Sequence, residues 1–376
     1  MSLMLADTGG WFHDLSPFVW RISGNFGIRW YGVSYLLAFA VAFLLLRWLA
    51  KRGVTPIPKD RIADAMMLLV GGVIVGGRMG YVLLYDPSLL IDFSGSLPWW
   101  GVLRLTNGGM SSHGGFLGVM AACWWIAKGF KDEQGNRVGV CPAMHVMDMC
   151  AMVAPLGLML GRLANFVNGE LLGKVVAMPG QPAPWWSVRY PQEILERPLD
   201  SLPHSPEQLD QIVRLSSQYT LPSDQHWDQG YMRVLDLIRK GNDQLQGQLE
   251  PLLSARYPTQ LMQAFFDGLL VFIIVWAIAY KPRRVGVLGA WMWIVYALGR
   301  IPMDLVRLPD SGVSQFGPLT RGQGYSLLML LTGIIALIVI HRAKRPLMGG
   351  WGSGVPLATE SSDAEGGAET KDDNPE

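Results

Sequence analysis

Charge is scarce in this chain. Only 16% of its 376 residues are Asp, Glu, Lys or Arg, whereas a soluble domain usually carries about 25%. Hydrophobic residues make up 50% of the chain, and the mean hydropathy is +0.24. This composition is typical of a protein that crosses a membrane several times. The formal net charge is +1, so no global basic field indicates binding to nucleic acid.

Cysteine is scarce as well. The three cysteines, Cys123, Cys141 and Cys150, lie within or beside apolar runs. An odd number without paired spacing argues against a disulfide framework or a zinc site, so we interpret them as buried small side chains. We expect neither a bound metal nor a cofactor. The first 30 residues also lack the uninterrupted apolar run of a cleavable signal peptide.

Long apolar stretches, by contrast, are abundant. A bilayer core about 30 Å thick takes roughly 20 apolar residues in a helix. Seven stretches qualify, some only loosely: 31–50, 63–84, 108–127, 143–161, 260–280, 286–306 and 324–341. We therefore predict an all-α fold, a polytopic membrane protein with about seven transmembrane helices within residues 31–345. No internal repeat of the transporter kind is visible.

The distribution of Lys and Arg predicts the orientation. These residues gather in the connections after the first, third, fifth and seventh stretches, for example Lys51 and Arg52, or Arg283 and Arg284. Positively charged short loops face the cytoplasm. We therefore expect the N-terminal segment, residues 1–30, on the extracytoplasmic side and the C-terminus in the cytoplasm.

Two segments lie outside this pattern. Residues 174–256 are too many for a simple loop, and the patterns LDQIVRL and VLDLIRK indicate helices. We predict that they form a small extracytoplasmic helical arm or head. Residues 346–376 are rich in Gly, Ser, Asp and Glu and cannot bury enough apolar surface to fold, so we predict a disordered acidic cytoplasmic tail.

Ionisable side chains inside a span are costly and usually face a cavity or a partner. Arg78 lies among Gly72, Gly76 and Gly80, whose spacing of four forms a smooth face for close helix packing. Arg78 itself either contacts a ligand or pairs structurally.

Two further ionisable groups have different interpretations. His113 lies in GGMSSHGGFLG, where the glycines permit tight turns or the close approach of a ligand. A neutral imidazole there could accept a proton near neutral pH, although a lone histidine is more often structural. Asp148 opens the fourth stretch, and an acid near a helix N-terminus is a common structural choice.

The run GRLANFVNGELLG, residues 161–173, places polar groups directly after the apolar residues of the fourth stretch. Arg162, Asn165, Gly169 and Gly173 share one helical face if the helix persists. A guanidinium and an amide on one face can together bind a phosphate or a carboxylate. Glu170 could hold the arginine or act as a base. The alternative, equally favoured by spacing alone, is a helix end that reaches water.

The sixth stretch contains a similar group. Arg300, Asp304 and Arg307 are spaced four and three, again on one helical face. Pro302 frees the carbonyl of Leu298 and should bend the helix. The group is either a self-satisfied ion-pair ladder or an anion site. Together with Arg78 and Arg162, these arginines indicate a phosphate-bearing ligand that resides in the membrane, namely a phospholipid.

The chain resembles a known family, the bacterial prolipoprotein diacylglyceryl transferases. GRLANFVNGELLG is similar to the signature of that family, and five more segments match in order: RWYGVSYLLAF, GGRMGYVLLY, GGMSSHGGFLG, YPTQLMQAFFDG and GRIPMDLVRLPD. The resemblance implies a seven-helix enzyme of the bacterial inner membrane with an extracytoplasmic head. It also implies that the enzyme transfers the diacylglyceryl group of phosphatidylglycerol to the lipobox cysteine of a prolipoprotein, with release of glycerol phosphate.

The resemblance further implies the functional residues. The implied catalytic residues are Tyr31, His113, Arg162, Glu170 and Arg300. The implied contacts to phosphatidylglycerol come from Arg78, Arg162, Asn165, Gly173, Arg300, Asp304 and Arg307. The partners are then phosphatidylglycerol, prolipoprotein signal peptides and membrane lipids, and we expect a monomer.

The sequence departs from the family at several positions. Asp304 stands where we expect Glu, and Arg29, Tyr257 and Gln263 stand where some members have His, His and Glu. The general base is therefore either His113 or Glu170. A rival hypothesis, a lipid or anion transporter, would use the same buried arginines but usually shows repeated halves.

Overall fold

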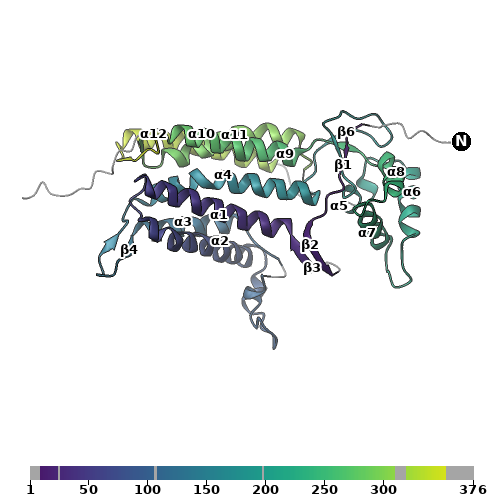
Figure 1. Cartoon of the computed structure of the whole chain (residues 1–376), viewed down its shortest axis with the longest axis horizontal. Coiled ribbons are helices and arrows are strands. Elements are labelled where there is room, and N and C mark those ends of the chain that lie inside the picture. The colour runs from purple at the N-terminus through teal and green to yellow at the C-terminus, as the bar shows by residue number, and fades with distance from the viewer. Residues whose placement is uncertain (1–8, 24–25, 106–107, 197–198, 310–318, 353–376) are drawn as a thin grey trace, which may run out of the picture.

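The computed structural model describes residues 9–23, 26–105, 108–196, 199–309 and 319–352. The molecule is elongated, with long helices side by side along its long axis and a smaller body at one end (Figure 1). The predicted disordered tail lies outside the described residues from residue 353 onward, as do residues 1–8 of the N-terminal segment.

Long helical runs form the bundle. Each of the seven predicted stretches falls on one of them: α1 (Trp30–Lys51), α2 (Ile62–Leu84), α3 (Ser112–Ala127), α4 (Ala143–Asn168), the run α9–η7–α10, α11 (Val287–Val306) and α12 (Arg321–Arg342). The α9–η7–α10 run consists of α9 (Thr259–Gln263), the π-helical turn η7 (Ala264–Leu269) and α10 (Leu270–Ile278). Within the described residues, five helices are long and apolar enough to cross a membrane. The helix α3, which has 16 residues, is not among these five, and neither is α11.

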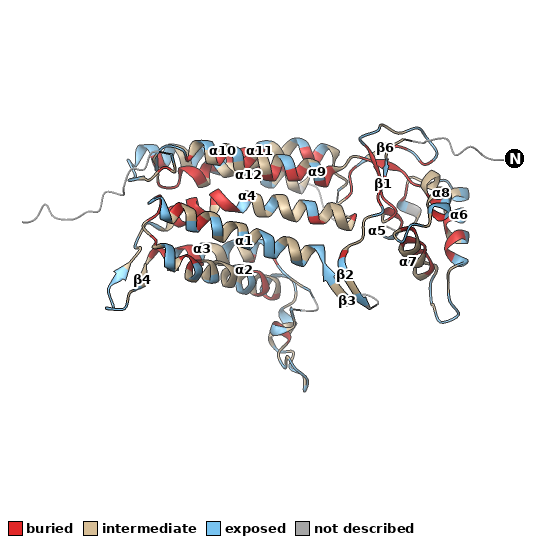
Figure 2. Cartoon of the chain, in the orientation of Figure 1, coloured by how far each residue is buried: buried red, intermediate tan, exposed pale blue. Residues whose placement is uncertain are grey.

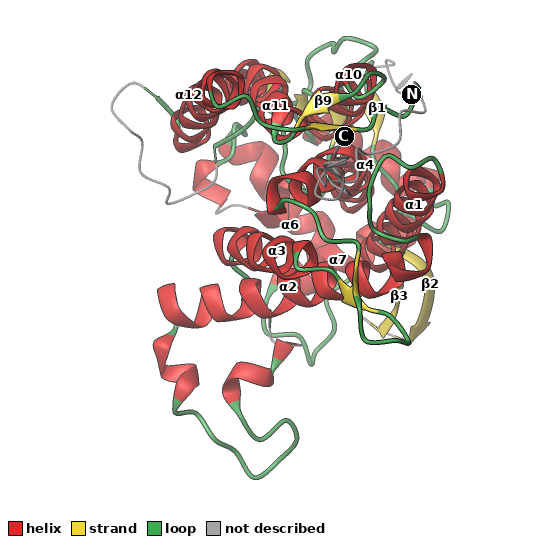
Figure 3. Ribbon diagram, turned by 90° about the vertical axis from the view of Figure 1, so that its left-hand side faces the viewer, coloured by secondary structure: helices red, strands yellow, loops and turns green. Residues whose placement is uncertain are grey.

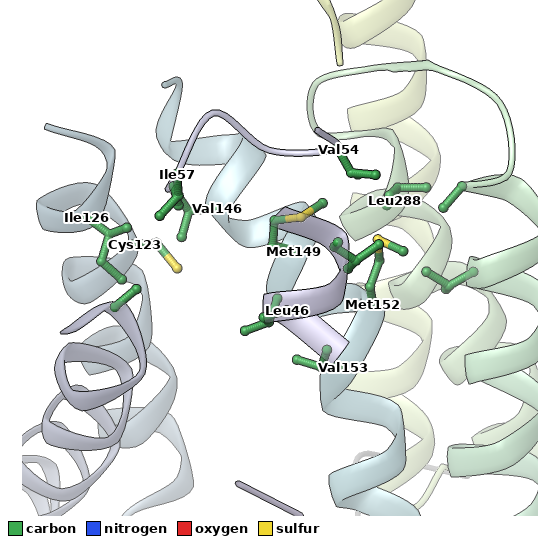
Figure 4. Close-up of a cluster of buried hydrophobic side chains, with 14 of the residues drawn as sticks. Leu46, Val54, Ile57, Cys123, Ile126, Val146, Met149, Met152, Val153 and Leu288 are labelled. Atoms are coloured by element: carbon green, nitrogen blue, oxygen red, sulfur yellow. The ribbon is translucent and has the colours of Figure 1, made fainter. Parts of the chain in front are cut away.

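The core of the bundle lies around α4, which packs against α1, α3, α11 and the α9–η7–α10 run. Figure 4 shows part of it, where Leu46, Val146, Met149 and Met152 meet between the helices. The outward faces are exposed but apolar, as Leu36 of α1 and Leu328 of α12 illustrate (Figure 2). An exposed apolar surface of this extent is the surface that lipid covers in a membrane protein. The cysteines are free, with Cys123 buried and the other two partly buried.

The helices α2 and α3 approach each other through glycine, as the spacing predicted. A Cβ atom on Gly72 would lie 2.6 Å from the carbonyl oxygen of Gly118, and one on Gly80 would lie 2.6 Å from Cα of Gly114. These distances leave no room for a side chain. Gly114 and Gly118, which follow His113, thus serve helix packing, while the histidine itself stays exposed.

The prediction that GRLANFVNGELLG forms one helical face is wrong beyond residue 168. The helix α4 ends at Asn168, and Gly169 adopts the left-handed conformation with φ of 69°, its N–H bonded to the carbonyls of Asn165 and Phe166. Glycine is the residue that tolerates this cap best. Arg162 and Asn165 are therefore helical, whereas Glu170 and Gly173 lie in the loop that follows.

Asp148 does not cap its own helix. It lies in the second turn of α4, where its carboxylate accepts the N–H groups of Gly286 at 2.6 Å and Gly289 at 2.8 Å. It therefore caps α11, a structural role as the sequence suggested but on a different helix.

The smaller body, which we call the head, consists of residues 174–256 and β1. The sequence predicted helices here. LDQIVRL lies on α6 (Pro206–Ser217), and VLDLIRK covers the end of α7 (Trp227–Ile238) and the two residues after it. The head also holds α5 (Glu193–Glu196), α8 (Asp243–Leu249), η5 (Leu199–Ser201) and η6 (Glu250–Leu252). Its own apolar core includes Ile212, Tyr231 and Val234.

A small sheet in the head corrects the all-α prediction. Its strand order is β1 (Trp11–Phe12), β7 (Val188–Arg189), β8 (Ala255–Arg256) and β6 (Val175–Ala177). Strands of two or three residues are too short to show an alternating pattern, so the sequence could not reveal them. Trp11–Phe12 of the N-terminal segment thus belong to the head through β1.

Short elements connect the helices at both ends of the bundle. At the head end, a hairpin of β2 (Phe18–Ser23) and β3 (Phe26–Arg29) leads into α1, and a segment with η2 (Pro87–Leu90) and η3 (Gly101–Leu103) projects sideways after α2 (Figures 1 and 3). At the opposite end lie η1 (Lys59–Arg61), the hairpin of β4 (Phe130–Lys131) and β5 (Arg137–Val138), and the pair β9 (Arg283–Arg284) and β10 (Leu347–Met348).

Candidate active site

The end of α11 nearest the head carries a buried ion pair. Nη2 of Arg300 lies 2.9 Å from Oδ1 of Asp304, and both residues are 8% exposed. The other carboxylate oxygen of Asp304 accepts the hydroxyl of Thr320 at 3.1 Å. Thr320 is the N-cap of α12. Asp304 therefore ties Arg300 to the start of the next helix, and the spacing of four places the pair on one face as predicted.

Asp267 completes this group, although it is not among the residues predicted from the sequence. Its carboxylate is 1% exposed and lies 3.8 Å from Nη1 of Arg300. It belongs to η7, a π-helical turn inside an otherwise apolar run. The signal was present, because Asp267 is an acid inside the matched segment YPTQLMQAFFDG.

Arg162 lies near the same group on α4, which packs against both η7 and α11. It interacts electrostatically with Tyr296, Arg300, Asp267 and Arg307. The three arginines that the sequence predicted from GRLANFVNGELLG and from α11 are therefore brought together around one buried acid. A cluster of this kind is suited to an anion with several oxygens, since guanidinium groups bind phosphate in a bidentate manner.

A second polar group adjoins Arg162 on the side of α1. The Asn165 amide donates to the hydroxyl of Tyr31, and Nη1 of Arg162 donates to Oδ1 of Asn165 at 3.4 Å. The carboxylate of Glu170 also interacts with the Tyr31 hydroxyl. Three of the predicted catalytic residues, Tyr31, Arg162 and Glu170, thus form one network with Asn165. Within this network Glu170 interacts with Tyr31 rather than with Arg162.

The loop after α4 fixes this network in place. Gly173 pairs with Arg307 as an isolated antiparallel bridge, in which Lys174 N–H bonds to Val306 at 2.8 Å and Leu308 N–H to Leu172 at 3.0 Å. A Cβ on Gly173 would collide with the carbonyl of Tyr257. The requirement for glycine here is therefore steric, and the backbone pairing holds Arg307 at the end of α11.

Two side chains support Glu170, Gln260 of α9 and Tyr190 of the head. Gln260 donates to the backbone carbonyl of Glu170 at 2.7 Å, and the buried Tyr190 hydroxyl donates to Gln260 at 3.0 Å. His13 makes a second link, because its Nε2 bonds to the carbonyl of Phe166 in the last turn of α4 at 2.7 Å. Burial lowers the pKa of His13 to about 4, so the imidazole is neutral at pH 7.

A large cavity opens beside the arginines. It measures about 1200 Å³ and is bounded by side chains of α3, α4, α11 and α12. Its polar end contains Arg300, Asp304 and Arg307, and its other walls are mostly apolar, with residues such as Phe116, Leu158, Met292, Trp293 and Met329. An apolar chamber with cations at one end matches the shape of a phospholipid, whose acyl chains need hydrocarbon and whose phosphate needs charge.

His113 lies in the lining of this cavity on α3. Its ring meets the ring of Tyr325 of α12 edge-on, with centroids 5.9 Å apart. Tyr31, Asn165, Glu170 and Arg162 are not among the lining residues that the structure describes. The predicted site residues therefore form two adjoining groups, one lining the cavity and one next to it, with Arg162 between them.

Arg78 does not join either group. Its guanidinium is buried and donates to backbone carbonyls, among them Val102 at 2.7 Å, Gly108 at 2.7 Å and Gly101 at 2.8 Å. All of these carbonyls belong to the connection between α2 and α3. This geometry favours the structural alternative for Arg78, in which the arginine holds a loop.

Comparison with known proteins supplies the family. The family model described as prolipoprotein diacylglyceryl transferase matches residues 17–339. A protein named phosphatidylglycerol–prolipoprotein diacylglyceryl transferase from Bdellovibrio bacteriovorus is 35% identical over 355 residues, which cover 91% of this chain and 97% of the relative. Relatives with the same name from Stenotrophomonas maltophilia and Psychrobacter arcticus are 33% and 32% identical, covering 89% and 85% of this chain and 94% and 91% of their own.

Proposed function

Because the chain belongs to the prolipoprotein diacylglyceryl transferase family, we propose that its reaction takes place where Arg162, Arg300 and Arg307 meet the cavity. The enzyme transfers the diacylglyceryl group of phosphatidylglycerol to the lipobox cysteine thiol of prolipoproteins, which forms a thioether and releases glycerol phosphate. This is the first step of lipoprotein maturation. Because the chain belongs to a transferase family, we no longer favour the hypothesis of a lipid or anion transporter.

The observation that carries the proposal is the cavity of about 1200 Å³ with arginines at its polar end. The acyl chains of phosphatidylglycerol lie against the apolar walls, and the phosphate lies against Arg300 and Arg307. Arg162 approaches the phosphate from α4. The arginines stay charged at any physiological pH, so they stabilise the negative charge that develops on the leaving oxygen.

The thiol must lose its proton before it reacts, because the thiolate is the nucleophile. In the proposed mechanism His113 takes this proton, since it lines the cavity and is exposed to it. The sulfur then forms a bond to the glycerol carbon while the bond from that carbon to the phosphate oxygen breaks. The electron pair leaves with glycerol phosphate. Glu170 faces Tyr31 instead, so we assign Glu170, Tyr31 and Asn165 to orienting the headgroup.

We further propose the membrane arrangement that the sequence predicted. Seven spans place the head and the N-terminal segment on the extracytoplasmic side of the bacterial inner membrane, and the C-terminus in the cytoplasm. Two observations support this arrangement. The lysine and arginine connections alternate, and all of the site residues lie at the head end of the bundle.

Arginine substitutions test the site. Arg300→Ala or Arg162→Ala should lower kcat/KM for transfer from phosphatidylglycerol to a lipobox peptide by roughly 100-fold or more, the usual cost of losing a group that stabilises transition-state charge. Arg283→Ala at the opposite end of the bundle is the matched control and should leave kcat/KM unchanged. Full activity in both site variants would contradict the assignment of Arg162 and Arg300 to phosphate binding.

A further inference from the structure

Asp267 is unusual among the buried acids of this protein. Within the described residues, neither of its carboxylate oxygens has a hydrogen-bond partner, and neither does Nη1 of Arg300, which faces it at 3.8 Å. Asp304 and Asp148, by contrast, are hydrogen-bonded. A buried carboxylate without hydrogen bonds costs several kcal/mol unless another charge offsets it. The charges available are Arg300 together with Arg162 and Arg307.

The gap between Asp267 and Arg300 is set by the backbone. Asp267 lies in the π-helical turn η7, where the helix contains an extra residue. The neighbouring Gly268 packs against α4 so closely that a Cβ would lie 2.6 Å from Cβ of Met159. The turn is therefore locked against α4, and the short aspartate side chain ends before hydrogen-bonding distance. Such π-helical turns occur often at functional sites.

We propose that Asp267 is a positioning residue for the transfer reaction. It attracts the Arg300 guanidinium by charge while leaving the hydrogens of Nη1 unbonded, so that they are available to the lipid phosphate. Asp304 holds the other end of the same guanidinium by a direct bond of 2.9 Å. One acid fixes Arg300, and the other orients it without competing for its hydrogen bonds. This inference rests on the phosphate site proposed above and adds a residue to it.

The proposal predicts opposite effects for two substitutions. Asp267→Glu lengthens the side chain by one methylene group, closes the gap and bonds Nη1 directly, so the carboxylate competes with phosphate. Asp267→Asn keeps the shape but removes the negative charge. The arginines then attract phosphate more strongly, while Arg300 loses the charge that orients it, so kcat should fall. A residue that only supported the fold would weaken phosphate binding in both variants.

Inhibition by glycerol phosphate measures phosphate binding directly. Glycerol phosphate is the leaving group of the reaction, and it occupies the phosphate site without reacting. With the full-length enzyme in detergent, we expect the inhibition constant to rise about fivefold or more in Asp267→Glu and to fall about fivefold or more in Asp267→Asn, as Coulomb interactions at this distance permit. In Asp267→Glu the KM for phosphatidylglycerol should rise while kcat stays near its original value, because the competition affects bound substrate and transition state alike.

The controls separate the possible failures. Asp148→Asn removes another buried carboxylate at the far end of the bundle and should lower the Tm without changing the inhibition constant. If Asp267→Glu does not fold, Asp267→Asn decides alone: an unchanged or higher inhibition constant overturns the proposal. Inhibition constants that move in the same direction in both variants also overturn it. If Arg300→Lys leaves the inhibition constant unchanged, the phosphate site itself is wrong.

Discussion

Arg78 and Arg300 are both almost fully buried, with 5% and 8% of their surface exposed. The Arg78 guanidinium is occupied by carbonyl oxygens of the connection before α3. Arg300 bonds Asp304 on one side and, among the described residues, has no hydrogen-bond partner for Nη1. An arginine is available to a ligand only where the protein leaves some of its donors unbonded. This difference separates a loop anchor from a binding residue.

His13 is a second residue whose environment determines its behaviour. Its Nε2 bonds to Phe166 and its Nδ1 meets the amide of Gln192 at 3.1 Å, which requires a neutral ring. Burial lowers its pKa from 6.5 to about 4. The unfolded segment therefore binds the proton more readily, and stability present above pH 6.5 is lost as the pH falls toward 4.

This linkage gives a pH prediction. Between pH 6.5 and pH 4 the link from β1 to α4 should lose up to about 3 kcal/mol. Hydrogen exchange at the amides of Trp11 and His13, which bond to Ser187 and Arg189, should accelerate in this range. His13→Gln should remove most of the pH dependence. Equal pH dependence of exchange in the original protein and in His13→Gln would contradict the assignment of this pH dependence to His13.

At the scale of elements, the contact between α2 and α3 determines where His113 lies. The two helices touch through Gly72, Gly76 and Gly80 on one side and Gly114 and Gly118 on the other. Since His113 directly precedes Gly114, the close approach fixes the start of α3 relative to α2. The segment with Arg78 and its carbonyl partners then closes the end of this helix pair.

Single methyl groups test this contact. Gly76→Ala places a Cβ against the Gly114 carbonyl and should destabilise the protein by about 2 kcal/mol or more, as overpacking of a tight interface does. Gly71→Ala on the same helix meets nothing within 4 Å and should be neutral or slightly stabilising, because alanine favours helix. Thermal unfolding in detergent compares the two. A loss of the same size in Gly71→Ala, where a Cβ meets nothing within 4 Å, would contradict the assignment of the effect to packing between α2 and α3.

The elements also show how far the sequence predicts this structure. Long apolar stretches predicted the bundle because hydropathy acts over some 20 residues. The strands of the head contain two or three residues, and their pairing depends on contacts between distant segments, so no local pattern revealed them. Arg162, Arg300 and Asp304 were predictable as charges in apolar helices. Asp267 carried the same signal, but its importance depends on a π-helical turn and on the arginine opposite, neither of which has a local pattern.

At the scale of the whole molecule, the proposed topology separates the head from the opposite end of the bundle (Figure 1). Trp185 of the head is 86% exposed, and Gln134 lies in the exposed turn between β4 and β5. In a protein without its three native cysteines, Trp185→Cys should react with a membrane-impermeant maleimide in intact spheroplasts. Gln134→Cys should react only after permeabilisation. The reverse pattern would invert the topology.

The pairing of β1 with β7 also constrains biosynthesis. Trp11 and Val188 are aligned in parallel, yet the sequence between them contains α1, α2, α3 and α4. In the proposed topology the first strand reaches the outer surface early and has no partner until four spans have been inserted. The sheet is complete only after β8, around Arg256, has followed. Closure of the head therefore comes late in synthesis, and the network around Tyr31 and Glu170 gains its final support at that stage.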